Sequence, residues 1–199
     1  MKLVLASTSP FRKALLEKLQ LPFVCDKPEI DETPLPGEHI EAMVRRLSLE
    51  KARACAANHP DALIIGSDQS AVLGGEKLGK PGDFDTAMAQ LRAASGQAVT
   101  FYTGLCLLNS QSGKHQIDCV TCKVIFRQLD DATIRAYLEK EQPFNCAGSF
   151  KSEALGIALF ERFEGDDPNA LIGLPLIRLC TFLQNAGMPV LSIAHTHNR

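Results

Sequence analysis

The stretch that decides the fold is Ala62-Leu-Ile-Ile-Gly-Ser-Asp-Gln69, a short apolar run followed directly by polar residues and a carboxylate. Four consecutive apolar residues, rich in β-branched side chains, are typical of a strand that is buried on both faces. A carboxylate just after such a strand has to reach water, a cation or a metal, so Asp68 is a candidate functional residue. The alternative is a hairpin turn, because Gly66, Ser67 and Asp68 are turn-forming residues.

Length and composition favour one compact domain. The chain has 199 residues, 45% of them hydrophobic, and a chain of this size buries roughly 70% of its unfolded surface on folding. We expect a single domain over residues 1–199, with two lobes around a cleft and a disordered tail over about 192–199.

Charge and hydropathy exclude several classes of partner. The net charge of −2 gives no general electrostatic footprint for nucleic acid. No apolar stretch approaches the length of a membrane span, and the apolar segment after Lys2 is too short for a signal peptide. We therefore expect a cytoplasmic protein with no nucleic-acid and no membrane partner.

Two short motifs resemble known sites, and both are rejected. Gly74 to Lys80 has the glycine and lysine spacing of a phosphate-binding P-loop, but Pro81 stands where a Ser or Thr would hold magnesium. Cys119 and Cys122 form a CxxC pair, but residues three apart in an extended segment point to opposite faces, and no second pair follows. We expect these cysteines to pack in the core.

The first residues predict a strand, a turn and a helix in close succession. Lys2–Ala6 is a strand candidate, Ser7–Ser9 is a polar turn, and Pro10 is typical of the first position of a helix. Backbone N–H groups at such a helix start bind anions, and Arg12 in the first turn can hold a phosphate through its guanidinium. The alternative is ordinary serine capping beside a solvated arginine.

Three charged residues become candidates only if they share a site. Glu32 lies in an acidic segment before a proline-rich loop, and such loops are usually just solvated. Apolar residues between Ile40 and Leu47 trace one stripe of a long helix, and Lys51 continues that stripe. A lysine in this position normally extends to the rim of the core, so Lys51 needs a partner before it has a role. Lys80 can meet a phosphate as a point charge.

The remaining pattern alternates strands and helices. A six-residue turn-forming stretch separates two predicted strands, Ala98–Leu108 and Gln116–Phe126, which therefore form a long hairpin. Small residues at 146–153 predict a turn where a ligand can approach the backbone. The other expected elements are a strand over Phe23–Cys25, a helix around Met88 and Leu91, a helix over Asp131–Lys140 capped by Asp130, a strand near Ile157–Phe163 and a helix from about Pro168 to Ala186.

Together these pieces resemble the Maf family of nucleotide pyrophosphatases over nearly the whole chain. The segments that carry the likeness, in the family's order, are LASTSPFR at 5–12, IDET at 30–33, LEKA at 49–52, IIGSDQ at 64–69, GKP at 79–81, CAGSFKSE at 146–153 and GLPL at 173–176. The resemblance implies a mixed α/β fold, in which helices flank an elongated, curved, mixed β-sheet and two lobes surround a deep nucleotide cleft. It also implies a homodimer.

By this resemblance the catalytic aspartate is Asp68. The other residues at motif positions are Ser7, Arg12, Glu32, Lys51 and Lys80. Hydrolysis between the α and β phosphates of a nucleotide needs a carboxylate to activate water, a divalent metal, and cations to carry the charge that gathers on pyrophosphate. We expect Asp68 and Glu32 to form the catalytic set with the two lysines and to hold Mg²⁺ or Mn²⁺. The three cations would bind phosphates, and Ser7 with neighbouring amides would seat one of them.

Three positions distinguish branches of the family, and here the chain resembles the branch that hydrolyses 7-methyl-GTP to 7-methyl-GMP and pyrophosphate. Gln69 stands where the dTTP/UTP branch has Thr, Glu153 where it has Gln, and Phe11 where the 7-methyl-GTP branch has an aromatic residue. Methylation at N7 makes guanine cationic, so an aromatic face attracts it, and a carboxylate can accept from its N1 and amino groups. The structural alternative is that Phe11 packs under the first helix and Glu153 only caps a turn.

Two other functions fit the same cleft. One is a broader nucleoside triphosphate pyrophosphatase that acts on dTTP, UTP or other modified nucleotides. The other is a nucleotide-sensing regulator of septation that binds without turnover. The full set of acidic and basic positions argues against the regulator, because a pure sensor has less need of all of them.

Overall fold

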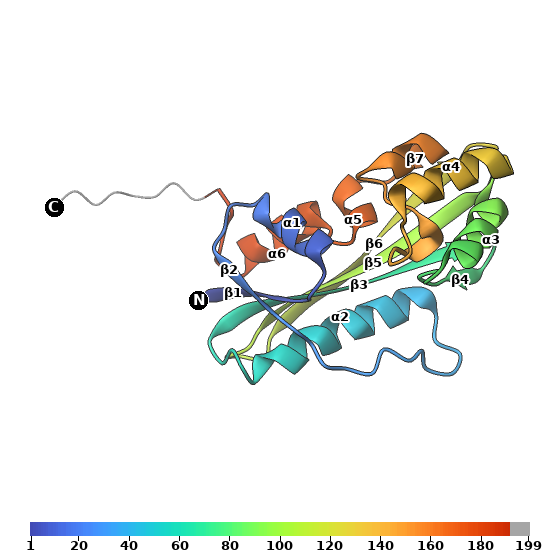
Figure 1. Ribbon diagram of the computed structural model, residues 1–199. Helices are drawn as coiled ribbons and strands as arrows, with labels where there is room; N and C mark the ends of the chain where they lie inside the picture. The colour runs from blue at the N-terminus through green and yellow to red at the C-terminus, as the bar shows by residue number, and fades with distance from the viewer. Residues whose placement is uncertain (192–199) are drawn as a thin grey trace.

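The computed structural model describes residues 1–191 and shows an elongated molecule built on a mixed seven-stranded sheet with helices on both faces (Figure 1). The strands are β1 (Lys2–Ala6), β2 (Phe23–Asp26), β3 (Ala62–Leu73), β4 (Glu76–Leu78), β5 (Ala98–Asn109), β6 (His115–Phe126) and β7 (Phe160–Glu164). The helices are α1 (Pro10–Glu17), α2 (Ile40–Ala56), α3 (Phe84–Ala94), α4 (Asp131–Glu141), α5 (Pro168–Ile172) and α6 (Leu176–Asn185). Two short 3₁₀ helices, η1 (Ala147–Ser149) and η2 (Leu155–Leu159), lie between α4 and β7.

These elements confirm the predicted fold class, a mixed α/β fold in which helices flank a mixed sheet. The β5–β6 hairpin and the helix capped by Asp130 also lie within one residue of their predicted bounds. The disordered tail expected over about 192–199 lies outside the described residues. None of the helices that the structure describes has the length and apolar composition that a membrane span needs.

A gap in the pairing of β3 places Asp68. The strand order is β2-β1-β3-β5-β6-β7, and β4 also pairs with β3. β5 pairs with one edge of β3 from Leu63 to Leu73, whereas on the other edge β1 pairs only as far as Ile65 and β4 begins only at Ala71. Among the described strands, residues 66–70 therefore have no partner on that edge. An interruption of this kind is a usual place for a ligand cavity.

The turn alternative for Gly66–Gln69 is wrong, because β3 continues through these residues to Leu73. Asp68 therefore lies in the middle of a strand and not at its tip. Pairing with β5 supplies backbone hydrogen bonds that keep this polar segment extended, and such tertiary pairing overrides local turn preference. Because side chains alternate along a strand, Ile64, Gly66 and Asp68 face one side of the sheet and Gln69 faces the other.

Two glycines let α2 lie close to one face of the sheet. A Cβ atom at Gly66 would lie 1.9 Å from the carbonyl oxygen of Ser48, and one at Gly104 on β5 would lie 2.3 Å from that of Val44. Only a residue without a side chain permits so close an approach. The packing brings the part of α2 that carries Lys51 against the middle of β3.

We expect Gly66→Ala to lower the free energy of unfolding by about 3 kcal/mol, because overpacking a rigid backbone contact is destabilising. The new methyl group would overlap Ser48 O, and α2 would have to move away from the sheet. Urea denaturation measures the change. Gly79→Ala is the control, since a Cβ there has nothing within 4 Å. An unchanged unfolding midpoint for Gly66→Ala would contradict this contact.

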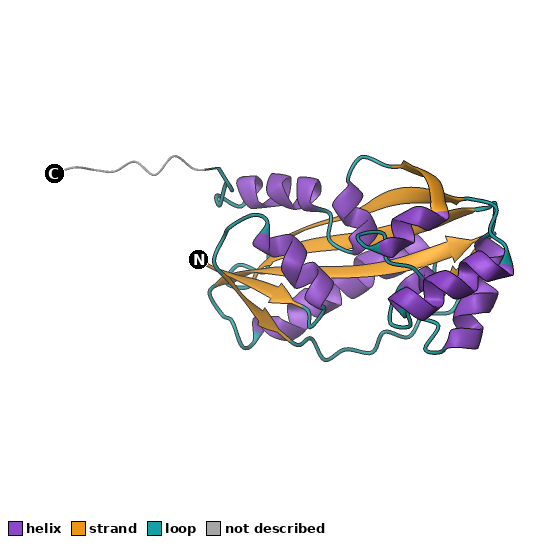
Figure 2. Ribbon diagram, turned by 45° about the horizontal axis from the view of Figure 1, so that its top comes forward, coloured by secondary structure: helices purple, strands orange, loops and turns teal. Residues whose placement is uncertain are grey.

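Helices cover the other face of the sheet toward both of its ends (Figure 2), and an apolar cluster of side chains lies under each group of helices. The cluster under α1 and α6 includes Leu5, Leu16, Ile65, Leu105 and Leu183. The cluster under α3 and α4 includes Ala71, Met88, Phe101, Leu138 and Phe150. On β3 the first cluster ends at Ile65 and the second begins at Ala71. The gap at 66–70 therefore lies between the two packed lobes.

Two predictions near the end of the described chain are wrong. The helix expected from Pro168 to Ala186 is two helices, because Gly173 has a φ of 125° and Pro175 follows it. The strand expected near Ile157–Phe163 begins later, at Phe160, because the residues before it form η2. The helix break matters for the site, since it leaves the carbonyl of Gly173 to accept hydrogen bonds from Arg12 and Ser67.

Neither rejected motif forms the site that it resembles. Gly74 and Gly75, with φ values of 58° and 92°, make the tight turn of a hairpin between β3 and β4. A strand follows this turn, whereas a helix follows the glycine-rich loop of a P-loop protein. Cys119 and Cys122 pack in different apolar clusters, one beside α2 and one beside α3 and α4. Both cysteines are free thiols.

Candidate active site

One cavity collects every side chain nominated from the sequence. Its volume is about 730 Å³, within the size range of small-ligand sites. The nominated residues that line it are Ser7, Phe11, Arg12, Glu32, Lys51, Asp68, Gln69, Lys80 and Glu153. They come from the β1–α1 turn, α1, the loop before α2, α2, β3, the loop after β4 and the segment after η1. The fold thus brings together residues that are far apart in the chain.

Lys51 joins two carboxylates. Its Nζ lies 2.6 Å from Oδ1 of Asp68 and 2.9 Å from Oε1 of Glu32. Lys51 and Asp68 are 6% and 7% exposed, whereas Glu32 lies on the exposed rim. In a buried pair of this kind, the attraction between the two groups offsets part of the cost of removing each from water. The contact uses one oxygen of each carboxylate, so Oδ2 of Asp68 can face a water or a ligand.

Arg12 is held at the cavity by the break between α5 and α6. Its Nε donates to the carbonyl of Gly173 at 2.8 Å, and Ser67 Oγ donates to the same carbonyl at 3.0 Å. At the start of α1, Ser9 Oγ accepts from the backbone N–H of Arg12 and Ser7 Oγ accepts from that of Ser9. In these contacts the side chain of Arg12 donates through Nε alone, so its two terminal guanidinium nitrogens can hold a phosphate.

The charges of the cavity act on one another. Burial alone would raise the pKa of Glu32, but the hydrogen bond and charge of Lys51, together with two further cations, hold that pKa below its usual value. These two cations are Lys80 and Arg12. Burial lowers the pKa of Arg12, while the charges of Asp68 and Glu32 oppose the change. Among the residues that line the cavity, five Lys and Arg side chains outnumber three carboxylates, and this excess of positive charge attracts a polyphosphate.

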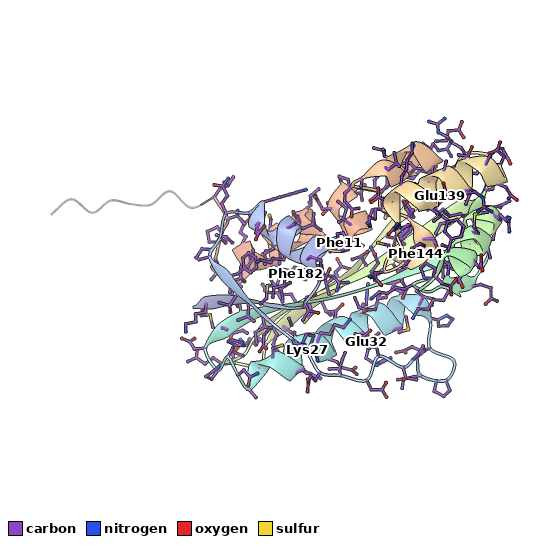
Figure 3. All side chains as sticks on the ribbon, viewed as in Figure 1. Phe11, Lys27, Glu32, Glu139, Phe144 and Phe182 are labelled. Carbon is purple, nitrogen blue, oxygen red and sulfur yellow. The ribbon has the colours of Figure 1, made fainter. Side chains whose placement is uncertain are left out.

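The loop that carries Glu32 is fixed to α2 by an arginine. Arg46 forms a bidentate pair with Glu38, with N···O distances of 2.6 and 2.7 Å, and it also donates to the carbonyl of Thr33 at 3.3 Å. Hydrogen bonding from Arg46 lowers the pKa of Glu38 to about 2. Figure 3 labels Lys27 and Glu32 in this segment, near α2. The anchor limits where the carboxylate of Glu32 can lie.

The carboxylates fit a divalent cation that arrives with phosphates. Mg²⁺ in such sites is bound by one or two carboxylates plus phosphate oxygens and water, and not by an all-protein cage. Asp68 and Glu32 are two such carboxylates, joined through Lys51. Among residues 1–191 no group of three or more His, Cys, Asp or Glu side chains is arranged to hold a metal by itself. The donor set therefore matches a cation shared with a ligand.

Aromatic side chains also line the cavity. Phe11 is half-buried and lines the cavity, so its ring is not wholly packed under α1, and its contact with a base stays a prediction. Phe101 and Phe150 line it as well, with their rings edge to face at a centroid distance of 5.6 Å. Glu153 is exposed and also lines the cavity. An aromatic ring beside a carboxylate can receive a flat cationic ring.

Gln69 bridges β3 to α5. Its Nε2 donates to the carbonyls of Ala170 at 2.8 Å and Leu171 at 3.0 Å, and it also lies 3.0 Å from Thr103 Oγ1. The amide nitrogen is therefore committed to the protein. Only the side-chain oxygen is left for a ligand. A substitution at Gln69 would therefore change both this oxygen and the hydrogen bonds that hold α5.

Two further cations of the cavity wall were not nominated from the sequence, namely Lys27 and Lys151. Lys151 lies inside the segment CAGSFKSE, so a signal was available. Lys27 follows β2 and lies outside every motif, so no sequence pattern distinguished it from other surface lysines. Both reach the cavity through loops whose course depends on tertiary packing.

Comparison with known proteins identifies the family of the chain. A family model described as "Maf-like protein" matches residues 2–186. The chain is 58% identical to a protein of Nitrosococcus oceani over 189 residues, 95% of each chain. It is 56% identical to proteins of Pseudomonas savastanoi pv. phaseolicola, over 94% of this chain and 98% of the relative, and of Vibrio cholerae, over 96% and 98%. Each of these relatives is named 7-methyl-GTP pyrophosphatase. Since the matched residues run from β1 to α6 and include every nominated residue of the cavity, the chain belongs to the Maf family.

Proposed function

We propose that the protein hydrolyses 7-methyl-GTP to 7-methyl-GMP and pyrophosphate, with a divalent cation bound beside the substrate. The observation that carries this proposal is the buried contact between Lys51 and Asp68, in a cavity lined by further cations and a second carboxylate. The names of the relatives support the same substrate. A nucleotide pyrophosphatase needs a carboxylate, cations and room for a polyphosphate, and this cavity supplies all three.

In the proposed reaction, Asp68 takes a proton from the attacking water at Oδ2, the oxygen that Lys51 does not contact. Lys51 holds Oδ1 at 2.6 Å, so the carboxylate is oriented before substrate binds. Glu32 lies on the other side of the same ammonium, at 2.9 Å. Asp68 and Glu32 are the residues that would hold Mg²⁺ or Mn²⁺, which supplies charge neutralisation on the phosphates when bound.

The remaining cations bind the substrate's phosphates. Arg12 offers its terminal guanidinium nitrogens, and Lys80 offers an ammonium from the loop after β4. Ser7 and the backbone amides at the start of α1 seat one phosphate. These groups carry the negative charge that gathers on the leaving pyrophosphate, which lowers the barrier to cleavage.

The base is selected by the aromatic and acidic wall. Phe11 stacks against the cationic 7-methylguanine ring, and Glu153 accepts from its N1 and amino groups. Gln69 contributes through its side-chain oxygen and through its hold on α5. A neutral pyrimidine gains neither the charge attraction nor the purine's stacking area.

A substrate panel tests the proposal. With Mg²⁺ present, we expect kcat/KM for 7-methyl-GTP to exceed that for GTP, dTTP and UTP by about tenfold or more, because a cationic ring gains from an aromatic face and a carboxylate. Pyrophosphate and 7-methyl-GMP should appear in equal amounts. Glu153→Gln should remove much of the preference, whereas Glu161→Gln, at an exposed site on β7 outside the cavity, should keep it.

Other outcomes of the panel point elsewhere. Equal or faster release of pyrophosphate from dTTP or UTP would favour the broader pyrophosphatase. Stepwise release of orthophosphate would indicate a different class of hydrolase. Tight binding of 7-methyl-GTP without turnover would favour the nucleotide-sensing regulator.

Several expectations from the sequence stay proposals. The homodimer is implied by the family resemblance, whereas a cytoplasmic location, a single domain over residues 1–199, and the absence of nucleic-acid and membrane partners were expected from length, charge and hydropathy. They are independent of the reaction, since the contacts above lie within one chain. Sedimentation of the purified protein measures the oligomeric state directly.

A further inference from the structure

A carboxylate at the end of α4 ties both ends of the turn that carries Glu153. Glu141 Oε1 accepts from Lys151 Nζ at 3.0 Å, and Glu141 Oε2 accepts from the backbone N–H of Leu155 at 3.1 Å. The same ammonium also donates to the backbone carbonyl of Glu141 at 3.2 Å. Ser152 and Glu153 lie between these two anchors, and both line the cavity.

This contact is better shielded than an ordinary surface ion pair. The side chains of Glu141 and Lys151 are 15% and 23% exposed, whereas fully solvated pairs contribute little to structure. The chain before the turn has its own anchors. Tyr137 OH accepts from the backbone N–H of Lys151 at 3.0 Å, and Phe150 packs edge to face against three other aromatic rings. After Lys151 the turn has one backbone hydrogen bond of its own, from Ala154 N–H to the Lys151 carbonyl at 3.3 Å, and Glu141 holds both of its ends.

Glu141 also neutralises a cation on the cavity wall. Lys151 lines the cavity, and an unpaired ammonium there would repel the cationic ring of 7-methylguanine. Pairing with Glu141 cancels most of that repulsion and draws the ammonium toward α4. One carboxylate thus sets both the shape of the turn and the charge that the base meets.

We propose that Glu141 is a positioning residue for base selection. By holding Lys151 and Leu155 it fixes the carboxylate of Glu153 against the cavity and keeps the charge of Lys151 from the base. Glu141 itself is not among the described residues that line the cavity, so it acts through these neighbours and not on the substrate. The inference rests on the proposed function, because it presumes a cationic base in this cavity.

The test compares 7-methyl-GTP with GTP, which differ in the methyl group and its positive charge. Glu141→Gln keeps the length of the side chain and an oxygen acceptor but loses the ion pair. We expect the ratio of kcat/KM for 7-methyl-GTP to that for GTP to fall about tenfold, because a charge-assisted hydrogen bond is lost. The fall should appear as a higher KM for 7-methyl-GTP, with kcat for GTP within about twofold of wild type.

Two further variants make the result specific to Glu141. Glu141→Asp keeps the charge on a shorter side chain, so its ratio should lie between those of wild type and Glu141→Gln. Glu139→Gln is the matched control, because Glu139 is an exposed glutamate of the same helix (Figure 3), and it should keep the wild-type ratio. Melting temperatures confirm that each variant is folded before the kinetics are compared.

The outcomes separate this inference from the proposed function. A wild-type enzyme that prefers 7-methyl-GTP, with the same ratio in Glu141→Gln, would overturn the positioning role and leave the proposed function standing. An equal fall in kcat/KM for both nucleotides would also overturn it, because a purely structural role has that signature. A wild-type enzyme without the preference would overturn the proposed function, and this inference with it.

Discussion

Asp68→Asn is expected to lower kcat for nucleotide hydrolysis by about 10³-fold, within the range that a positioned general base supplies. The asparagine keeps an oxygen that can accept from Lys51 Nζ, which lies 2.6 Å from Oδ1 of Asp68. The geometry of the cavity should therefore survive. The variant loses the oxygen that takes a proton from water, and it loses a metal ligand. Steady-state release of pyrophosphate at saturating 7-methyl-GTP measures the effect.

The matched control for this variant is Asp61→Asn, because Asp61 is an exposed aspartate just before β3. We expect wild-type turnover from it. Thermal melting of both variants shows whether either loses the fold. A kcat for Asp68→Asn within about threefold of wild type would mean that another group activates the water.

Lys51→Met is expected to lower both stability and activity. Methionine fills similar space without a charge, so Asp68, which is 7% exposed, would be left buried without its cation. Removing one partner of a buried ion pair costs about 3 kcal/mol or more. We expect kcat/KM to fall about 10²–10³-fold as well, because the ammonium orients Asp68 and stabilises charge on the phosphates. Urea denaturation at neutral pH and steady-state kinetics measure the two effects.

The control for the lysine is Lys13→Met. Lys13 forms an exposed pair with Glu17 on α1 at 3.9 Å, and such pairs contribute about 0.5 kcal/mol or less. Its unfolding midpoint and turnover should therefore stay near those of the wild type. Equal losses of stability in Lys51→Met and Lys13→Met would contradict the buried pairing of Lys51 with Asp68.

Much of the local structure could be predicted from the sequence because local pattern determines it. Proline at the start of α1 and aspartate before α4 are helix-start signals, and the structure has both helices there. The apolar stripe from Ile40 to Leu47 directed Lys51 toward the sheet, where the structure places it. The shared position of the nominated residues followed from the family resemblance, since no local pattern links segments so far apart in the chain.

The features that could not be predicted depend on tertiary neighbours. Turn-forming residues at 66–69 remain extended because β5 pairs with them, and the two glycines under α2 have a role only once the helix lies on the sheet. Glu141 and Lys27 carry no motif. Glu141 is the last residue of α4, but its partners Lys151 and Leu155 come from the following segment, and Lys27 reaches the cavity from the loop after β2. The break at Gly173 was the exception, because a glycine and a proline two residues later did signal the end of a helix.

A crystal structure of Asp68→Asn with 7-methyl-GTP and Mg²⁺ tests most directly whether these residues surround one nucleotide. We expect the triphosphate between Arg12 and the two lysines, Lys51 and Lys80, with the base against Phe11 and within hydrogen-bonding distance of Glu153. A triphosphate bound outside this cavity, or bound inside it without contact to any of the three cations, would contradict the proposed site.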